Sequence, residues 1–241
     1  MLSVEYKIEN VIKKQRRGKI VFAGDFSSFG SSEAVFKALQ RLQKSSLLMR
    51  VAHGIYYYPK INKNKYIDSK YLPPSIDEIA YGIAKRDKIR IAPTGAYALN
   101  TLGLSTQVPA NAVFITDGAP RRITVGKGKG ILLKHTSEAR SLAYKSKLLM
   151  LIVSALREIG ENKAMPQQLE IIKSHLSNVS QNELDADIQL MPIWVRKILL
   201  SLFYTFPKIH QHRSSENHYQ SVEIRLRNNA KHYNFRKFAS I

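Results

Sequence analysis

Residues 31–59 read SSEAVFKALQRLQKSSLLMRVAHGIYYYP, and this stretch decides the fold of the N-terminal part of the chain. Val35, Leu39 and Leu42 recur at helical spacing, so the pattern predicts a helix with one buried face. Two apolar runs follow the helix and are joined at His53-Gly54. Glycine suits a tight turn, and the flanking runs are rich in residues that favour strands. The stretch therefore predicts a helix followed by a β-hairpin.

The opposite face of the predicted helix is polar and basic. At the same helical spacing it carries Lys37, Gln40, Arg41 and Lys44. A solvated helix face is the alternative interpretation, but we favour contact with DNA because the cations gather on one side only. Ser31 and Ser32 lie at the helix start, where a serine either caps the backbone or binds a phosphate. The sequence leaves both roles open for these two serines.

The order of elements around this helix is informative. A helix is predicted over residues 3–14 and a brief one over 26–29, ahead of the helix at 31–44. Helix, short helix, helix and hairpin is the order of a winged helix-turn-helix. In such a unit the third helix enters the major groove, which is about 12 Å wide. Arg50 and His53, on the hairpin, would then reach phosphates or the minor groove.

The remainder of the chain divides by its turn residues and its periodicity. A Lys-, Asn- and Tyr-rich segment ends at Pro73-Pro74, and Ser75 to Glu78 form a capping box that opens a helix. Short apolar strands and then amphipathic helices follow. The predicted fold class is α+β, with an N-terminal winged helix-turn-helix, a small α+β middle domain and a helical C-terminal region. The predicted ranges are 1–60 for the winged unit, 61–74 for a linker, 75–140 for the middle domain, 141–206 for the helical region and 207–241 for a basic tail.

The net charge restricts the class of partner. Lys and Arg number 38 against 18 Asp and Glu, which gives +20 and a pI of about 10.1. A polyanion relieves self-repulsion of this size, and nucleic acid is the most economical one. An anionic membrane is the rival, but no clear basic amphipathic helix or lipid site is present. With no cysteine and no apolar run of about 20 residues, we expect a cytoplasmic protein that does not enter a membrane.

We expect no enzymatic activity, no cofactor and no metal. Residues 126–130 alternate glycine and lysine but lack the G-x-x-x-x-G-K-[ST] frame of a phosphate-binding loop, so a hairpin turn is predicted. Asp185-x-Asp187 is far from Gly30-Ser31, so a nucleotidyltransferase site is not predicted. The histidines at 210, 212 and 218 lie in the basic tail without cysteine partners. Further nucleic-acid contacts in the middle domain are expected from Arg121, Arg122, Lys127 and Lys129.

Two stretches resemble a known family. One is residues 31–59 with the wing Arg50-Val-Ala-His-Gly54-Ile55-Tyr56, and the other is PTGAYALNTLGLSTQVPANAVFIT, residues 93–116. Together they resemble the AbiE-type (AbiEi-like) antitoxins of type IV toxin–antitoxin systems, over roughly residues 5–140. One departure is that Ser45-Ser46 stands where the family usually has a glycine after the recognition helix. The helical C-terminal third is not covered by the resemblance.

The resemblance implies a phage-defence antitoxin that binds double-stranded DNA. Such proteins bind inverted repeats in their own promoter, repress their operon, and counter a nucleotidyltransferase-like toxin without an obligatory stable complex. Two alternatives stay open. One is an RNA-binding module, which the charge, the tyrosines and the basic tail suit equally. For Tyr56, Tyr57 and Tyr58 we favour a core strand with one or two exposed rings over a base-stacking platform. The other is a protein whose C-terminal helices sequester the toxin. The sequence does not give the operator, the toxin or the oligomeric state.

Overall fold

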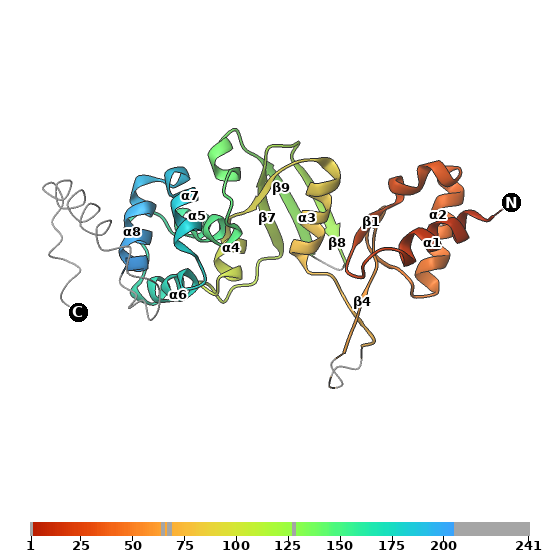
Figure 1. Ribbon diagram of the computed structural model, residues 1–241, viewed down its shortest axis with the longest axis horizontal. Helices are drawn as coiled ribbons and strands as arrows, with labels where there is room; N and C mark the ends of the chain where they lie inside the picture. The colour runs from red at the N-terminus through yellow and green to blue at the C-terminus, as the bar shows by residue number, and fades with distance from the viewer. Residues whose placement is uncertain (1, 64–65, 67–68, 127–128, 205–241) are drawn as a thin grey trace, which may run out of the picture. The chain divides into compact units, whose positions relative to one another are not determined.

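The computed structural model describes residues 2–63, 66, 69–126 and 129–204, which form a mixed α+β protein (Figure 1). The first elements are α1 (Val4–Lys13), β1 (Ile20–Phe22), the 3-10 helix η1 (Ala23–Phe29), α2 (Ser32–Lys44), β2 (Met49–Ala52) and β3 (Ile55–Tyr57). Then come β4 (Lys60–Ile61), β5 (Tyr71–Leu72), α3 (Ile76–Asp87), β6 (Ile91–Pro93), α4 (Gly95–Thr101), β7 (Asn111–Thr116), β8 (Arg121–Val125) and β9 (Lys129–His135). The last are η2 (Ala139–Leu142), α5 (Lys147–Ile159), α6 (Pro166–Leu176), α7 (Gln181–Asp187), η3 (Ile188–Leu190) and α8 (Ile193–Tyr204). The predicted α+β class is confirmed.

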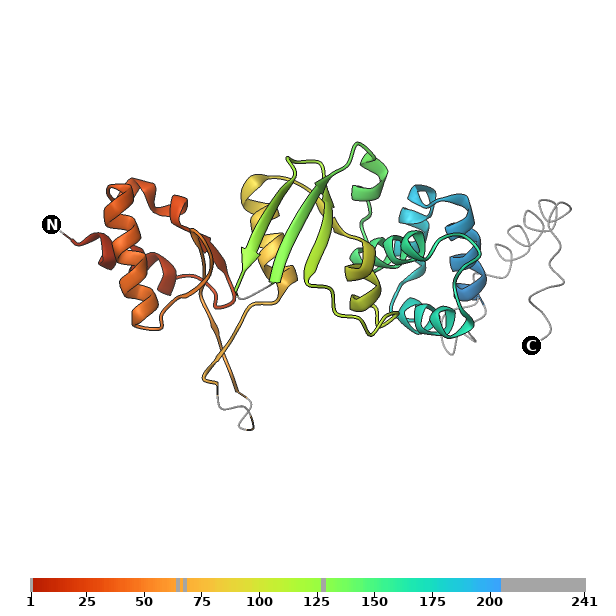
Figure 2. The same ribbon diagram turned by 180° about the vertical axis from the view of Figure 1, so that it is seen from behind.

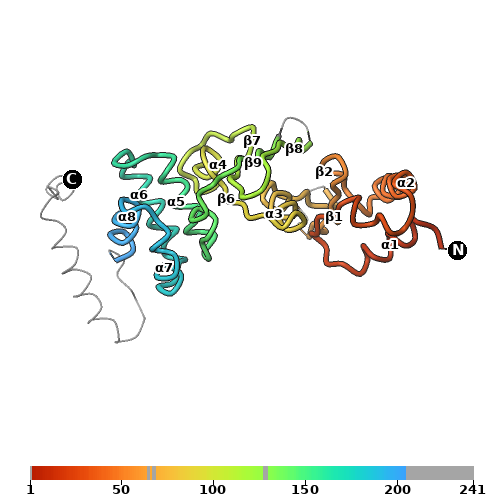
Figure 3. Tube along the Cα trace, turned by 90° about the horizontal axis from the view of Figure 1, so that it is seen from above, coloured from red at the N-terminus to blue at the C-terminus, as the bar shows by residue number. Residues whose placement is uncertain are grey.

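The first helices form where their sequences predict. Ser3 caps α1 by accepting the N–H of Tyr6, and Ser31 caps α2 by accepting the N–H of Ala34, each at 3.2 Å. α1 and α2 lie side by side (Figure 3). Their shared core consists of Ile8, Ile12, Val35, Ala38, Leu39 and Leu42, together with Phe26 of η1. The helices predicted over 3–14 and 31–44 are confirmed, and the brief one at 26–29 belongs to the longer η1.

β1, β3 and β2 form a three-stranded antiparallel sheet with β3 in the middle. The turn between β2 and β3 falls at His53-Gly54, as predicted. Gly54 has a φ of +67°, in the left-handed region that glycine adopts at little cost. The N–H of Ala23 donates to the carbonyl oxygen of Gly54 at 2.9 Å, which ties the turn to the end of β1.

Both faces of this sheet are covered. Val21, Tyr56 and Tyr58 face the core shared with α1 and α2. Ile20, Ile55 and Tyr57 face a second core, because successive strand residues point to opposite faces. All three tyrosines are therefore buried, at 6 % exposure or less. The prediction that one or two of their rings would be exposed is wrong, since a central strand between two layers has no exposed face.

The second core joins the N-terminal sheet to the middle of the chain. It includes Ile79 and Ile83 of α3 together with Phe114 of β7 and Leu133 of β9. Gly82 allows close contact, because a Cβ there would lie 2.9 Å from the Cβ of Ile20. Residues 61–74, predicted as a linker, contain most of the β4–β5 ladder. The domain boundaries remain a prediction, and the structure adds that ranges 1–60 and 75–140 share one core.

The middle sheet has the strand order β6-β7-β9-β8, with β7 and β9 parallel and the other pairs antiparallel. α3 lies against one face (Figure 2), where Tyr81 meets Phe114 edge-on at 6.3 Å between ring centroids. The other face contacts η2 and α5 through Ala92, Leu142 and Met150. The predicted capping box at the start of α3 is present, because Ser75 and Glu78 each accept the other's backbone N–H. The predicted strands and helices of this region are confirmed.

The C-terminal helices α5 to α8 have buried apolar faces, as their periodicity predicts. Asp187 is fully buried at the end of α7. Its carboxylate accepts the backbone N–H groups of Lys145 and Ser146, at 2.9 and 2.8 Å, and so anchors the start of α5. This carboxylate therefore has a structural role. Within the described ranges, no helix combines the length and apolar character needed to cross a bilayer.

We expect Tyr56→Phe to preserve or raise the free energy of unfolding by up to about 1 kcal/mol. The Tyr56 hydroxyl is buried and has no hydrogen-bond partner among the described residues, so removing it removes a desolvation cost. Urea denaturation monitored by circular dichroism measures the change. As a control, Tyr56→Ala should lose about 3–5 kcal/mol through the cavity that it creates. A loss above 1 kcal/mol in the phenylalanine variant would mean that the hydroxyl is bonded.

Candidate nucleic-acid interface

α2 presents two distinct faces. Its buried face is formed by Val35, Ala38, Leu39 and Leu42. The side predicted to contact DNA is exposed along its whole length and carries Lys37, Gln40, Arg41 and Lys44. The structure therefore brings all four predicted residues to one accessible surface, which we call the α2 face. The same surface also exposes Phe36, which the sequence reasoning missed although its position outside the apolar stripe was visible in the pattern.

Carboxylates already engage two cations of the α2 face. Lys37 pairs with Glu33 one turn earlier, at 2.6 Å, and Arg41 pairs with Glu5 of α1, at 3.0 Å. The side chains of Gln40 and Lys44 make no hydrogen bond or ion pair with any residue that the structure describes. Exposed ion pairs contribute about 0–1 kcal/mol, so the two paired cations can exchange their carboxylates for phosphates at small cost.

The two serines at the start of α2 have different positions. Ser31 is the capping residue, and its hydroxyl oxygen is occupied by the N–H of Ala34. Ser32 is the first helical residue and is exposed. Glu33 follows in the first turn, where an acid interacts favourably with the helix dipole and disfavours a phosphate at the same place. The capping role is thus shown for Ser31, and phosphate binding by either serine stays a prediction.

Arg50 and His53 meet at the hairpin turn. Nη2 of Arg50 lies 3.4 Å from Nδ1 of His53, and both side chains are exposed. The β2–β3 pairing shifts register between Arg50 and Ala52, which is a bulge that the sequence reasoning did not foresee. The contact places two nitrogen-rich side chains at one point beside the turn, as the wing interpretation requires.

The four residues predicted to contact nucleic acid in the middle domain have different surroundings. Arg121 is bound by Asp87, which also accepts a hydrogen bond from Arg86 at 2.7 Å. Arg122 is exposed on the edge strand β8. Lys127 lies outside the described residues, as does the side chain of Lys129. Arg121 is therefore an ion-pair residue first, and of this set Arg122 is the one shown to be accessible.

Arg86 is a further cation that the sequence did not single out. Its guanidinium lies 4.0 Å from the ring centroid of Phe22, a distance at which cation and ring attract each other. Burial pushes the pKa of Asp87 up, but the hydrogen bonds from Arg86 and Arg121 outweigh it and hold that pKa below its usual range. The end of α3 meets both Phe22 of β1 and Arg121 of β8, and only this tertiary packing brings the groups together, so no local signal could have shown them.

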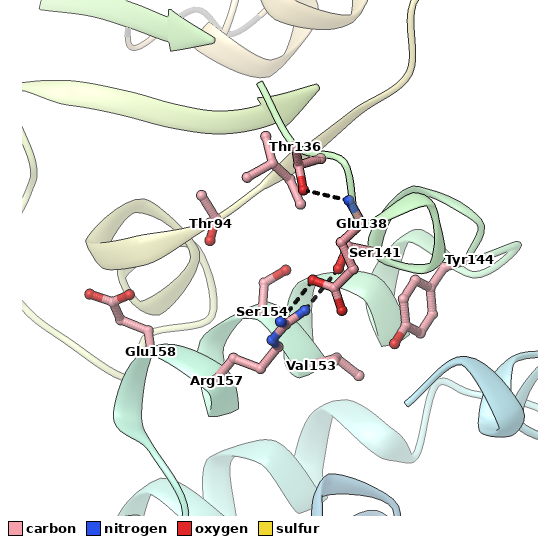
Figure 4. A pocket seen from close by; sticks show the side chains of 10 residues that line it. Thr94, Thr136, Glu138, Ser141, Tyr144, Val153, Ser154, Arg157 and Glu158 are labelled. Carbon is pink, nitrogen blue, oxygen red and sulfur yellow. Dashed lines mark hydrogen bonds and ion pairs between the residues drawn. The ribbon is translucent and has the colours of Figure 1, made fainter. Parts of the chain in front are cut away.

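A separate cavity of about 210 Å³ lies between β7, η2 and α5 (Figure 4). Arg157 donates to Glu138 and to Ser141, each at 2.8 Å, and so links α5 to the segment after β9. Burial raises the pKa of Tyr144 at this cavity to about 12. On this wall of the cavity, Arg157 and Glu138 pair with each other and so connect α5 to the segment before η2. The cavity is separate from the α2 face.

We expect Asp87→Asn to destabilise the protein by about 1 kcal/mol at neutral pH, since two arginines lose a partly buried partner. A carboxyl whose pKa is lowered by folding contributes stability above its unfolded pKa, and this is lost as pH falls through the folded pKa. The difference between wild type and variant should therefore be full above about pH 5 and shrink toward lower pH. Thermal or urea unfolding across pH measures it, and a difference independent of pH would contradict the ion-pair account.

A family model described as a family of unknown function, DUF6088, matches residues 7–184. That range includes most of α1, the α2 face, the hairpin, the middle sheet and most of α7. No curated protein matches the chain. Because the match covers well over half of the 241 residues, the chain belongs to the DUF6088 family.

Proposed function

We propose that this protein is a DNA-binding repressor of the AbiE-like antitoxin type, built on a winged helix-turn-helix. The observation that carries the DNA-binding part is the α2 face. It is a fully exposed row of polar and basic side chains on a helix whose other side is buried. The net charge of +20 supports the same class of partner.

In the proposed mechanism α2 enters the major groove. Gln40 and Lys44 are available directly, while Arg41 leaves Glu5 when it meets a base or a phosphate. A bidentate arginine contact to guanine, or a glutamine contact to adenine, supplies base discrimination. Arg50 and His53 contact the neighbouring phosphates or the minor groove, held in place by the hairpin turn.

The regulatory part of the proposal rests on the resemblance of residues 31–59 and 93–116 to AbiE-type antitoxins. It assigns the DNA target as inverted repeats in the protein's own promoter. It also assigns a nucleotidyltransferase-like toxin as the counterpart, without an obligatory stable complex. One DNA-reading helix per chain means that two chains are needed to cover an inverted repeat.

The three tyrosines of the hairpin do not support the RNA-binding alternative. A single-strand RNA platform needs exposed rings on which bases can stack. Tyr56, Tyr57 and Tyr58 are buried between two layers and cannot supply such rings without unfolding the sheet. Duplex DNA therefore remains the partner that the exposed groups favour.

We expect Arg41→Ala to lose about 1–3 kcal/mol of binding to the native operator if Arg41 reads a base, with relaxed site preference. Fluorescence anisotropy with a duplex from the upstream region, against a scrambled duplex, measures both quantities. Lys163→Ala, an exposed cation on a segment remote in sequence from α2, is the matched control. Unchanged preference in the Arg41 variant would count against the proposed reading of bases by α2.

The Glu5–Arg41 pair gives a test of opposite sign. Glu5→Gln frees Arg41 and removes a negative charge beside the α2 face, so duplex affinity should rise by about twofold to fivefold. The same anisotropy titration at low salt measures this gain. Glu170→Gln, an exposed acid on α6, should leave the affinity near wild type. Weaker binding by the Glu5 variant would show that the pair positions Arg41 instead of restraining it.

A further inference from the structure

Two basic segments that are far apart in the sequence meet at the end of the three-stranded sheet opposite the hairpin turn. One is the run Lys13 to Lys19, between α1 and β1, and the other is Lys60 to Lys70, which contains β4 and reaches β5. The sequence alone predicts only a linker over most of the second segment. Neither segment has a role in the proposed contacts of α2 and the hairpin.

Backbone hydrogen bonds fix this junction. The N–H of Gly18 donates to the carbonyl oxygen of Tyr58 at 2.7 Å, and the N–H of Tyr58 donates to the carbonyl oxygen of Lys19 at 2.9 Å. Gly18 has a φ of +97°, and a Cβ there would lie 2.6 Å from Cε of Lys60. Only glycine at position 18 therefore lets the side chain of Lys60 pass at this point without moving.

Arg17 is the structural member of the junction. It donates to the carbonyl oxygen of Pro59 at 2.9 Å, and its guanidinium lies 4.5 Å from the ring centroid of Tyr58. Lys13 pairs with Glu9, and Lys60 pairs with Glu78. Among the residues that the structure describes, these are the two ion pairs that engage the junction, and no other carboxylate pairs with its cations.

The remaining cations form an exposed set that we call the junction patch. Its side chains make no hydrogen bond or ion pair with any described residue, and Lys70 approaches only the ring of Tyr71 at 5.4 Å. Arg17 bonded to Pro59, and Gly18 lying against the side chain of Lys60, tie the first segment to the start of the second. The members of the junction patch are Lys14, Arg16 and Lys19 of the first segment, with Lys63 and Lys70 farther along the second, next to β4 and β5.

We infer that the junction patch binds the phosphate backbone of the same DNA duplex that α2 reads, so this inference rests on the proposed function. β1 and β3 are three residues long, and a strand rises about 3.3 Å per residue, so the Lys19 end of the patch lies roughly 10 Å from the hairpin turn along the sheet. Duplex DNA carries about one charge per 1.7 Å of its axis. Several phosphates are therefore within reach of both sites at once.

The charge also selects DNA over a second copy of the chain. The β4–β5 ladder is a two-stranded sheet, so both of its edges lack a strand partner within the described residues. Such edges can pair with another chain, and lysines are the usual protection against this. Two patches of the same sign repel each other, whereas a phosphate backbone neutralises both.

The test uses the full chain with Lys14, Arg16 and Lys19 all changed to Gln. These side chains are exposed, and the hydrogen bonds at Gly18 and Lys19 involve only the backbone, so folding should be preserved. The matched control changes Arg140, Lys145 and Lys163 to Gln, which removes the same charge elsewhere. Anisotropy with the upstream duplex, a scrambled duplex and an RNA hairpin is measured between about 50 and 200 mM salt.

We expect the slope of log K against log salt to fall by about 2–3 in the junction variant, because each phosphate contact contributes about 0.9. Affinity for both duplexes should fall by the same factor, since backbone contacts carry no sequence information. Lys63→Gln with Lys70→Gln should show a smaller loss of the same kind. A slope equal to that of the control variant, or a loss confined to the RNA hairpin, would overturn the inference.

The proposed function fails in a different way. Wild-type protein that binds the upstream and scrambled duplexes equally would remove the proposed repressor role. The junction patch would still be tested in that case by the salt slope on the scrambled duplex. A wild-type chain that binds no duplex at all would overturn both.

Discussion

The burial of β3 on both faces is the constraint on which the rest of the structure depends. β3 is only three residues long, yet it pairs with β1 on one side and β2 on the other. Its residues alternate between the core of α1 and α2 and the core of α3 and the middle sheet. Removal of a β3 side chain from either face therefore disturbs the packing of both layers at once.

This arrangement determines what the tyrosines can do. Tyr56 and Tyr57 fill space that smaller residues would leave empty, and burial raises the pKa of both hydroxyls. Buried rings contribute packing and apolar area, which is the largest favourable term in folding. The same burial removes them from any role in stacking on bases. A run of aromatic residues next to a basic strand therefore belongs to the core when both faces of its strand are covered.

The acids of this basic chain are used largely inside the fold. Asp87 holds two arginines, Asp187 anchors α5, and Glu78 closes a capping box while pairing with Lys60. Each of these carboxylates is engaged within the fold, in some cases by pairing with a cation and in others by accepting backbone N–H groups. Among the described residues, exposed cations that no ion pair engages lie on the α2 face, at the hairpin and in the junction patch, and others such as Lys163 lie elsewhere on the surface. These groups carry part of the net charge of +20 and are accessible to a polyanion.

The sequence by itself determined the local elements and the composition of the α2 face. Helical spacing located α1, α2, α3 and the C-terminal helices, capping residues located their starts, and Gly54 located the hairpin turn, because these signals act within a few residues. Only the tertiary structure decided the partners of those residues. The Arg41–Glu5 pair, Asp87 between its arginines, the second cover over β3 and the bonds of residues 17–19 to Tyr58 and Pro59 all join segments distant in the chain. No periodicity encodes such contacts, since they depend on how finished elements pack against one another.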